Sequence, residues 1–137
     1  MNILIIEDEH LAARRLENMI HEYDPSIKIV AQLESVTESV EWFRNNPAPD
    51  LIFLDIHLED NVSFAIFNQV TISSPFVFTT ATDQKSTREF EVKKIDYLLK
   101  PIIQKELVQM IEKYRKLPLS ERKVVDAETF RSFMNCK

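Results

Sequence analysis

The 137 residues predict an α/β fold, a doubly wound, five-stranded parallel sheet with helices on both of its faces. Short apolar runs of strand length alternate five times with longer segments whose apolar residues recur at helical spacing. The central runs are apolar throughout, which is typical of strands that helices cover on both sides. Strands and helices in this alternation are joined by right-handed crossovers, so the strands run parallel.

The first half of the chain holds three predicted strands and two predicted helices. The run "ILII" (Ile3–Ile6) is wholly apolar, and apolar residues then recur at helical spacing over residues 9–23. The segment "IKIVAQL" (Ile27–Leu33) alternates as a strand near the edge of a sheet does, and "VTESVEWFRNN" (36–46) has the spacing of a second helix. The run "LIFLD" (Leu51–Asp55) predicts a central strand.

The second half continues the alternation. A helix is predicted over "VSFAIFNQV" (62–70), a strand over "FVFTTA" (Phe76–Ala81) and a short, weakly amphipathic helix over "STREFEVKK" (86–94). A fifth strand follows in "DYLLK" (96–100), and a last helix in "QKELVQMIEKYRK" (104–116). The periodicity is lost from Pro118 onward, so we expect one domain over residues 1–116 and a C-terminal tail or linker over 117–137.

Composition and charge exclude several classes of protein. Hydrophobic residues make up 45% and charged residues 28%, as in an ordinary globular domain. The formal net charge of −5 gives no support for nucleic-acid binding by this segment. No apolar run approaches the ~20 residues of a transmembrane helix, and the N-terminus lacks the pattern of a signal peptide. A single cysteine, Cys136, fits a protein of the reducing cytoplasm.

Polar side chains stand where the predicted strands end. In a doubly wound sheet the functional crevice lies beyond the carboxyl ends of the strands, so residues at these ends are expected to meet. They are Glu7, Asp8 and Glu9 after the first strand, Asp55 at the third, Thr79 and Thr80 at the fourth, and Lys100 at the fifth.

Carboxylates, a hydroxyl and an ammonium group at one sheet edge suit phosphoryl transfer to a carboxylate. Clustered carboxylates repel one another unless a cation joins them, and Mg²⁺ binds one or two carboxylates together with phosphate oxygens. Asp8 and Asp55 are the candidate pair, with Glu7 reaching the ion through water. Asp55 is the candidate nucleophile. Lys100 and Thr80 would stabilise the charge that develops on the phosphoryl oxygens.

Four spaced motifs resemble the receiver domain of response regulators from two-component systems. They are "ILIIEDE", "LIFLDIHL", "FVFTTATD" and "IDYLLKP", and the match runs from about Met1 to Lys116. Within that family the segments "DIHL", "FTTATD" and "FEVKKIDYLLKPI" are most similar to receivers joined to a LytTR-type DNA-binding domain. The resemblance implies the flavodoxin-like receiver fold.

The resemblance also implies a role for each matching residue. Asp55 would accept a phosphoryl group from a sensor histidine kinase, with Mg²⁺ or Mn²⁺ as the cofactor. The implied metal ligands are Glu7, Asp8, Asp55 and the backbone carbonyl of His57. The implied catalytic residues are Thr80 and Lys100, the implied switch residues are Thr80 and Tyr97, and the Lys100–Pro101 peptide bond is expected to be cis.

Some positions depart from the family pattern. Glu7 stands where aspartate is commoner, which lengthens the reach of the carboxylate. Asn61 stands where glycine is usual, and asparagine tolerates a left-handed backbone better than other non-glycine residues. His57 and Thr82 occupy the two positions that border the water path to the phosphate in this family. We therefore expect this pair to influence the rate of dephosphorylation.

The resemblance further implies how the signal leaves the domain. The fourth helix, the fifth strand and the fifth helix would form an output face whose mixed charge suits a homodimer contact. Phosphorylation would change the shape of this face, and an attached transcription-regulating domain would respond to that change. The resemblance implies the activity of a regulatory phospho-acceptor in the cytoplasm, with intrinsic self-phosphorylation and autodephosphorylation, rather than that of an enzyme. No contact with nucleic acid or membrane is expected of this segment itself.

Other interpretations of the same residues stay open at this point. A haloacid-dehalogenase-type phosphatase also uses a strand-end aspartate with Mg²⁺, but it needs a second acid where His57 stands. A flavodoxin-like cofactor binder needs Gly, Ser or Thr after the first strand, where this chain has "EDEH". Asp55 could simply end its strand, Thr80 could be a core hydroxyl, and the chain could be a receiver that is no longer phosphorylated.

Overall fold

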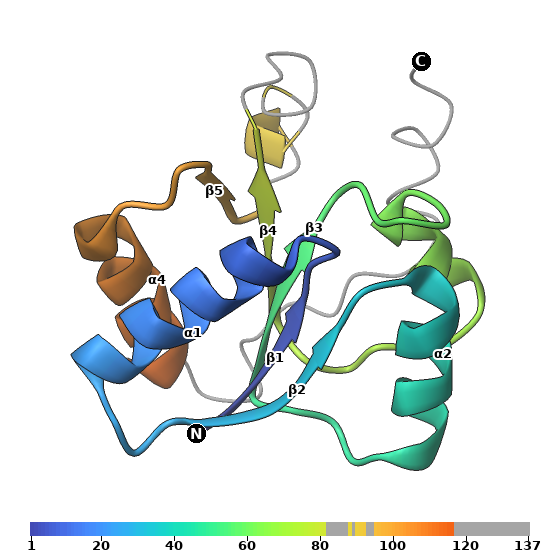
Figure 1. The fold of residues 1–137 in the computed structure, drawn as a ribbon, viewed down its shortest axis with the longest axis horizontal. Coiled ribbons are helices and arrows are strands. Elements are labelled where there is room, and N and C mark those ends of the chain that lie inside the picture. The colour runs from blue at the N-terminus through green and yellow to red at the C-terminus, as the bar shows by residue number, and fades with distance from the viewer. Residues whose placement is uncertain (82–87, 89, 93–94, 117–137) are drawn as a thin grey trace.

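The computed structural model describes residues 1–81, 88, 90–92 and 95–116. Five parallel strands form one sheet in the order β2-β1-β3-β4-β5 (Figure 1). The strands are β1 (Asn2–Ile6), β2 (Lys28–Leu33), β3 (Leu51–Asp55), β4 (Phe76–Thr80) and β5 (Tyr97–Leu99). The predicted doubly wound, five-stranded parallel sheet is confirmed, although β2, β4 and β5 are shorter than predicted.

Helices cover both faces of the sheet. The helices α1 (His10–Tyr23) and α4 (Gln104–Lys116) lie together on one face, and α2 (Val36–Asn45) lies on the other with the 3₁₀ helix η1 (Ser63–Asn68) (Figure 1). Arg88 and residues 90–92 are also helical. The rest of the helix predicted over 86–94, and the predicted tail over 117–137, lie outside the described residues.

The helix predicted over residues 62–70 is present, but it is shorter than predicted and has the tighter 3₁₀ geometry. This is η1, with bonds such as that from the Ala65 amide to the Val62 carbonyl, 3.1 Å. Every residue from Ser63 to Phe67 is buried, whereas an amphipathic α-helix exposes one side. Apolar residues spaced three apart fit either helix, so the periodicity did not distinguish them.

The central strands contribute side chains to two hydrophobic cores, one on each face of the sheet. Alternate residues of a strand point to opposite faces, so Ile5 and Phe53 pack toward α1 and α4, while Leu4 and Leu54 pack toward α2. All residues of β3 are buried, including Asp55 at its end. This double cover explains why the strand sequences are continuously apolar.

The longest described helix, α1, has 14 residues. Nowhere in the described residues does a helix combine the length and the apolar character that crossing a membrane requires.

Candidate functional site

Three carboxylates gather where β1 and β3 end. Glu7 and Asp8 directly follow β1, Asp55 is the last residue of β3, and the two strands are hydrogen-bonded neighbours. One carboxylate oxygen from each of the three residues lies within 4.8 Å of the others. Glu7 and Asp55 are buried, whereas Asp8 is exposed, so the cluster is open to solvent on the Asp8 side.

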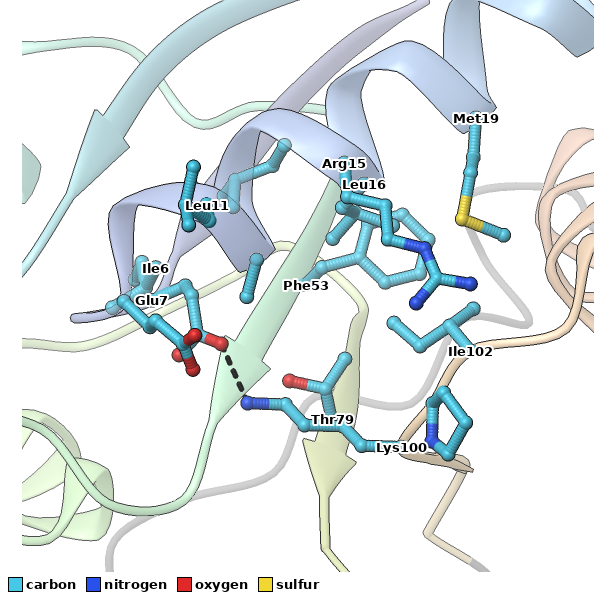
Figure 2. A pocket seen from close by; sticks show the side chains of 14 residues that line it. Ile6, Glu7, Leu11, Arg15, Leu16, Met19, Phe53, Thr79, Lys100 and Ile102 are labelled. Carbon is cyan, nitrogen blue, oxygen red and sulfur yellow. Dashed lines mark hydrogen bonds and ion pairs between the residues drawn. The ribbon is translucent and has the colours of Figure 1, made fainter.

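Lys100 reaches this cluster from the end of β5. Its Nζ donates to Glu7 Oε1 at 2.5 Å and to Asp55 Oδ2 at 3.3 Å, and Figure 2 shows the ammonium pointing toward Glu7. The backbone amide of Lys100 donates to the Thr80 carbonyl at 2.8 Å, which holds the segment against β4. The Lys100–Pro101 peptide bond is cis.

Glu7 is a buried carboxyl group with a raised pKa. Only 5% of the residue is exposed, and its Oε2 is buried without a hydrogen-bond partner among the described residues. Burial, and then the neighbouring carboxyl of Asp55, raise the pKa of Glu7 from 4.5 to about 7, against the opposing effect of Lys100. Burial alone would lower the pKa of Lys100, but the bond to Glu7 and the charges of Asp55 and Glu7 raise it. Lys100 is therefore held as a cation between two acids.

The donor set fits a hard divalent cation. The three carboxylates offer oxygen ligands within reach of one another, and the orphaned Oε2 of Glu7 is a buried acceptor that lacks a positive partner. Asp8 and Asp55 suit direct contact with Mg²⁺, because Glu7 already accepts from Lys100 through its other oxygen. His57 lies two residues beyond Asp55 in an antiparallel bridge with Val62, and the residue is exposed.

The two threonines at the end of β4 face different surroundings. Thr80 is buried, and its hydroxyl donates to the Ala81 carbonyl at 2.9 Å rather than to the acids. Thr79 pairs with Asp55 in the β3–β4 register and lies beside Lys100 in Figure 2. Strand alternation puts Thr79, and not Thr80, on the face that carries Lys100, a consequence that the sequence analysis missed.

Tyr97, the predicted switch aromatic, lies at the start of β5 and away from the acids. Its hydroxyl donates to Glu91 Oε1 at 2.8 Å, and this bond, followed by burial, raises the pKa of Tyr97. Its ring lies against Phe90, with centroids 5.6 Å apart. Thr82, the other predicted tuning residue besides His57, lies outside the described residues.

A pocket of about 290 Å³ adjoins the Glu7–Lys100 pair. Side chains of α1, including Leu11, Leu16 and Met19, form one wall, and Phe53 and Ile102 form others (Figure 2). Arg15 also lines the pocket, and its guanidinium group lies near Ile102 in the same view. The edge of the sheet that carries Glu7, Asp8, Asp55 and Lys100, here called the reacting edge, is thus bordered by apolar surface on the side of α1.

Comparison with known proteins identifies the family. The model of the response regulator receiver domain matches residues 3–112. The chain belongs to this family. The receiver is 39% identical over 119 residues to the sensory transduction protein LytT of Enterococcus faecalis, covering 85% of this chain and 48% of that protein. It is 34% identical to the transcriptional regulatory protein LytR of Staphylococcus aureus, covering 84% of this chain and 47% of that one.

Solved structures agree with this assignment. The response regulatory domain of protein mrkE from Klebsiella pneumoniae superimposes with a TM-score of 0.70 at 27% identity, covering 84% of this chain and 95% of that one. A two-component response regulator from Clostridium difficile shares the fold, with a TM-score of 0.70 at 23% identity, covering 85% and 96%. The receiver spans about half the length of the curated relatives that it matches. It is a signalling domain of the two-component type.

Proposed function

We propose that this receiver accepts a phosphoryl group on Asp55 from a sensor histidine kinase, in a reaction that requires Mg²⁺ or Mn²⁺. One observation carries the proposal: the Asp55 carboxylate lies within 4.8 Å of two other acids and 3.3 Å from the Lys100 ammonium. A carboxylate that merely ended its strand would need neither a part-buried lysine nor two acidic neighbours.

The side chains of the cluster divide the work. A carboxylate oxygen of Asp55 forms the new bond to phosphorus, while the bond from phosphorus to the donor's histidine nitrogen breaks. Lys100 neutralises negative charge on the phosphoryl group, because its pKa is held high and it remains a cation. Asp8 and Asp55 would hold the metal, which supplies positive charge to the phosphoryl oxygens. Glu7 orients Lys100 through the 2.5 Å contact.

The output would follow from the Thr80 hydroxyl and Tyr97. Phosphorylation would give the Thr80 hydroxyl a better acceptor than the Ala81 carbonyl that it now contacts. Movement of Thr80 would then bias the position of Tyr97, and with it the face formed by Arg88, residues 90–92, β5 and α4. We propose that this face forms a homodimer and controls an attached transcription-regulating domain. The name of the Staphylococcus aureus relative supports a transcriptional output.

We expect intrinsic self-phosphorylation from small phosphodonors, and autodephosphorylation at a rate that His57 and Thr82 influence. The domain would act in the cytoplasm, where the kinase modules of two-component systems meet their receivers. Residues 1–116 would form the receiver and residues 117–137 a tail or linker.

The direct test is the intact mass of the protein after incubation with acetyl phosphate and Mg²⁺. We expect a labile gain of one phosphoryl group. This gain should be absent when EDTA is added before the phosphodonor. The variant Asp55→Asn should show no gain, and Glu59→Gln, which alters an exposed acid in the same loop, should react like the wild type. A gain in Asp55→Asn, or none in the folded wild type, would contradict the proposal.

A further inference from the structure

Asp60 fastens the loop that follows the phosphorylation site to a different element. It lies five residues beyond Asp55, between β3 and η1. Its carboxylate accepts three hydrogen bonds from the start of α2: from the Val36 amide at 2.7 Å, the Thr37 amide at 3.1 Å and the Thr37 hydroxyl at 3.0 Å. The first two amides of α2 thus find their acceptor 23 and 24 residues further along the chain.

These bonds are additional to the cap that α2 has of its own. The Ser35 hydroxyl accepts from the Glu38 amide at 3.0 Å, and Glu38 reaches back to the Glu34 amide at 2.8 Å. Asp60 satisfies two of the orphan amides that this local cap leaves open. Although burial would raise the pKa of Asp60, the bonds from Val36 and Thr37 lower it. Asp60 therefore sits as a charged carboxylate at the positive end of the helix.

The loop itself closes at its base. The Ser63 amide donates to the Ile56 carbonyl at 2.7 Å, the Leu58 amide donates to the Asn61 carbonyl at 3.0 Å, and His57 bridges Val62. The loop behaves as one compact turn. In the described part of the chain, Asp60 supplies the side-chain hydrogen bonds that tie this turn to another element.

We propose that Asp60 is a positioning residue for the phosphorylation site, because it fixes the turn that begins directly after Asp55 and contains His57. This inference rests on the proposed function, in which the Asp55 carboxylate and the His57 carbonyl help to hold the metal. Mg²⁺ demands near-ideal ligand geometry, so ligands on a loosened turn must be ordered at the moment of binding. That ordering reduces the affinity for the metal.

Two variants separate positioning from simple stabilisation of α2. Asp60→Ala and Ser35→Ala each remove an acceptor at the start of α2, but only Asp60→Ala releases the turn. We expect Asp60→Ala to weaken Mn²⁺ binding roughly fivefold, because the metal must then order a turn at a free-energy cost similar to that of immobilising one side chain. Ser35→Ala should bind like the wild type. Asp60→Asn keeps one acceptor oxygen and should lie between them.

The measurement is a titration of each folded protein with Mn²⁺, in which electron paramagnetic resonance reports the free ion. It needs no phosphorylation. Hydrogen exchange gives a second readout, and the Leu58 and Ser63 amides should exchange faster in Asp60→Ala but not in Ser35→Ala. If Asp60→Ala does not fold, Asp60→Asn carries the same comparison with a smaller effect.

The outcomes distinguish the two proposals. Equal Mn²⁺ affinity in Asp60→Ala and the wild type would overturn the positioning role and leave the proposed function standing. An equal loss in Ser35→Ala would also overturn it, because the effect would then come from α2 alone. No Mn²⁺ binding by the folded wild type would overturn both.

Discussion

At the scale of single residues, Glu7 is the most constrained group of the site. It is buried, it shares Lys100 with Asp55, and one of its oxygens has no partner among the described residues. A pKa near 7 means that the metal-free protein holds this carboxyl part-protonated at neutral pH. A divalent cation favours the ionised form, so binding of the metal and loss of the proton are linked.

This constraint predicts a pH dependence of stability in the metal-free protein. The pKa of Glu7 is higher in the folded state than its ordinary value of 4.5, so the folded state binds the proton more tightly. The resulting stabilisation is fully present below pH 4.5 and is lost as the pH rises through 7. Relative to Glu7→Gln, the wild type should therefore lose up to about 3 kcal/mol of unfolding free energy between pH 4 and pH 8.

Urea denaturation in EDTA at a series of pH values measures this difference. Glu59→Gln serves as the control, because Glu59 is an exposed glutamate of a neighbouring loop. Parallel pH profiles for the wild type and Glu7→Gln would contradict the prediction. Saturating Mg²⁺ should reduce the difference, since the cation supplies the positive charge that Glu7 lacks.

At the scale of elements, the hydrogen bond from Tyr97 to Glu91 joins β5 to the helical residues 90–92. If Tyr97 is the switch aromatic, this bond holds it in the unphosphorylated position. A hydrogen bond to a charged acceptor contributes about 1–2 kcal/mol, less where water competes. Glu91→Ala should therefore shift the resting equilibrium toward the phosphorylated form by roughly fivefold.

The shift can be followed by ¹⁹F NMR of fluorotyrosine, because the chain has only three tyrosines. In Glu91→Ala, the Tyr97 signal should lie part of the way toward its position in the phosphorylated wild type. Glu41→Ala removes an exposed acid from α2 and should leave that signal unchanged. A Tyr97 signal that is identical in Glu91→Ala and the unphosphorylated wild type would count against a holding role for Glu91.

The sequence predicted elements and strand-end residues better than it predicted contacts. The central strands β1 and β3 are continuous apolar runs because both faces are covered, so their ends, and the acids there, are visible in the sequence. The pairing of Asp60 with α2 was not predictable in this way, because it joins segments 23 and 24 residues apart. The 3₁₀ geometry of η1 was also hidden, since it depends on how completely its surroundings bury it.

At the scale of the whole molecule, the reacting edge and the proposed output face are separate surfaces. The acids lie at the ends of β1 and β3, whereas Tyr97 and Leu99 belong to β5 at the edge of the sheet. Exposed apolar side chains, Leu99 and Val92, occur on this output side, with 41% and 73% of each residue exposed. Their exposure suits a contact that forms only in one state of the domain.

We predict that phosphorylation converts the receiver from monomer to dimer through this face. Size-exclusion chromatography with light scattering should show twice the mass after treatment with acetyl phosphate and Mg²⁺. Leu99→Asp should weaken the dimer at least about tenfold, because it puts a charge into the apolar contact, and should still gain the phosphoryl mass. Leu11→Asp, on α1, changes an exposed leucine outside this face, with 74% of the residue exposed against 41% for Leu99, and is the control. A phosphorylated wild type that stays monomeric would contradict the prediction.

The strand order also has a consequence for the order of assembly during synthesis. The strands β2, β1 and β3 are neighbours and are complete by residue 55, so Glu7, Asp8 and Asp55 can meet as soon as the first half of the chain has left the ribosome. Lys100 joins from the far edge of the sheet, 45 residues after Asp55. The three acids are thus encoded before their ammonium partner, and wherever β1 and β3 pair before Lys100 arrives, a dissolved divalent cation would relieve the repulsion between the acids.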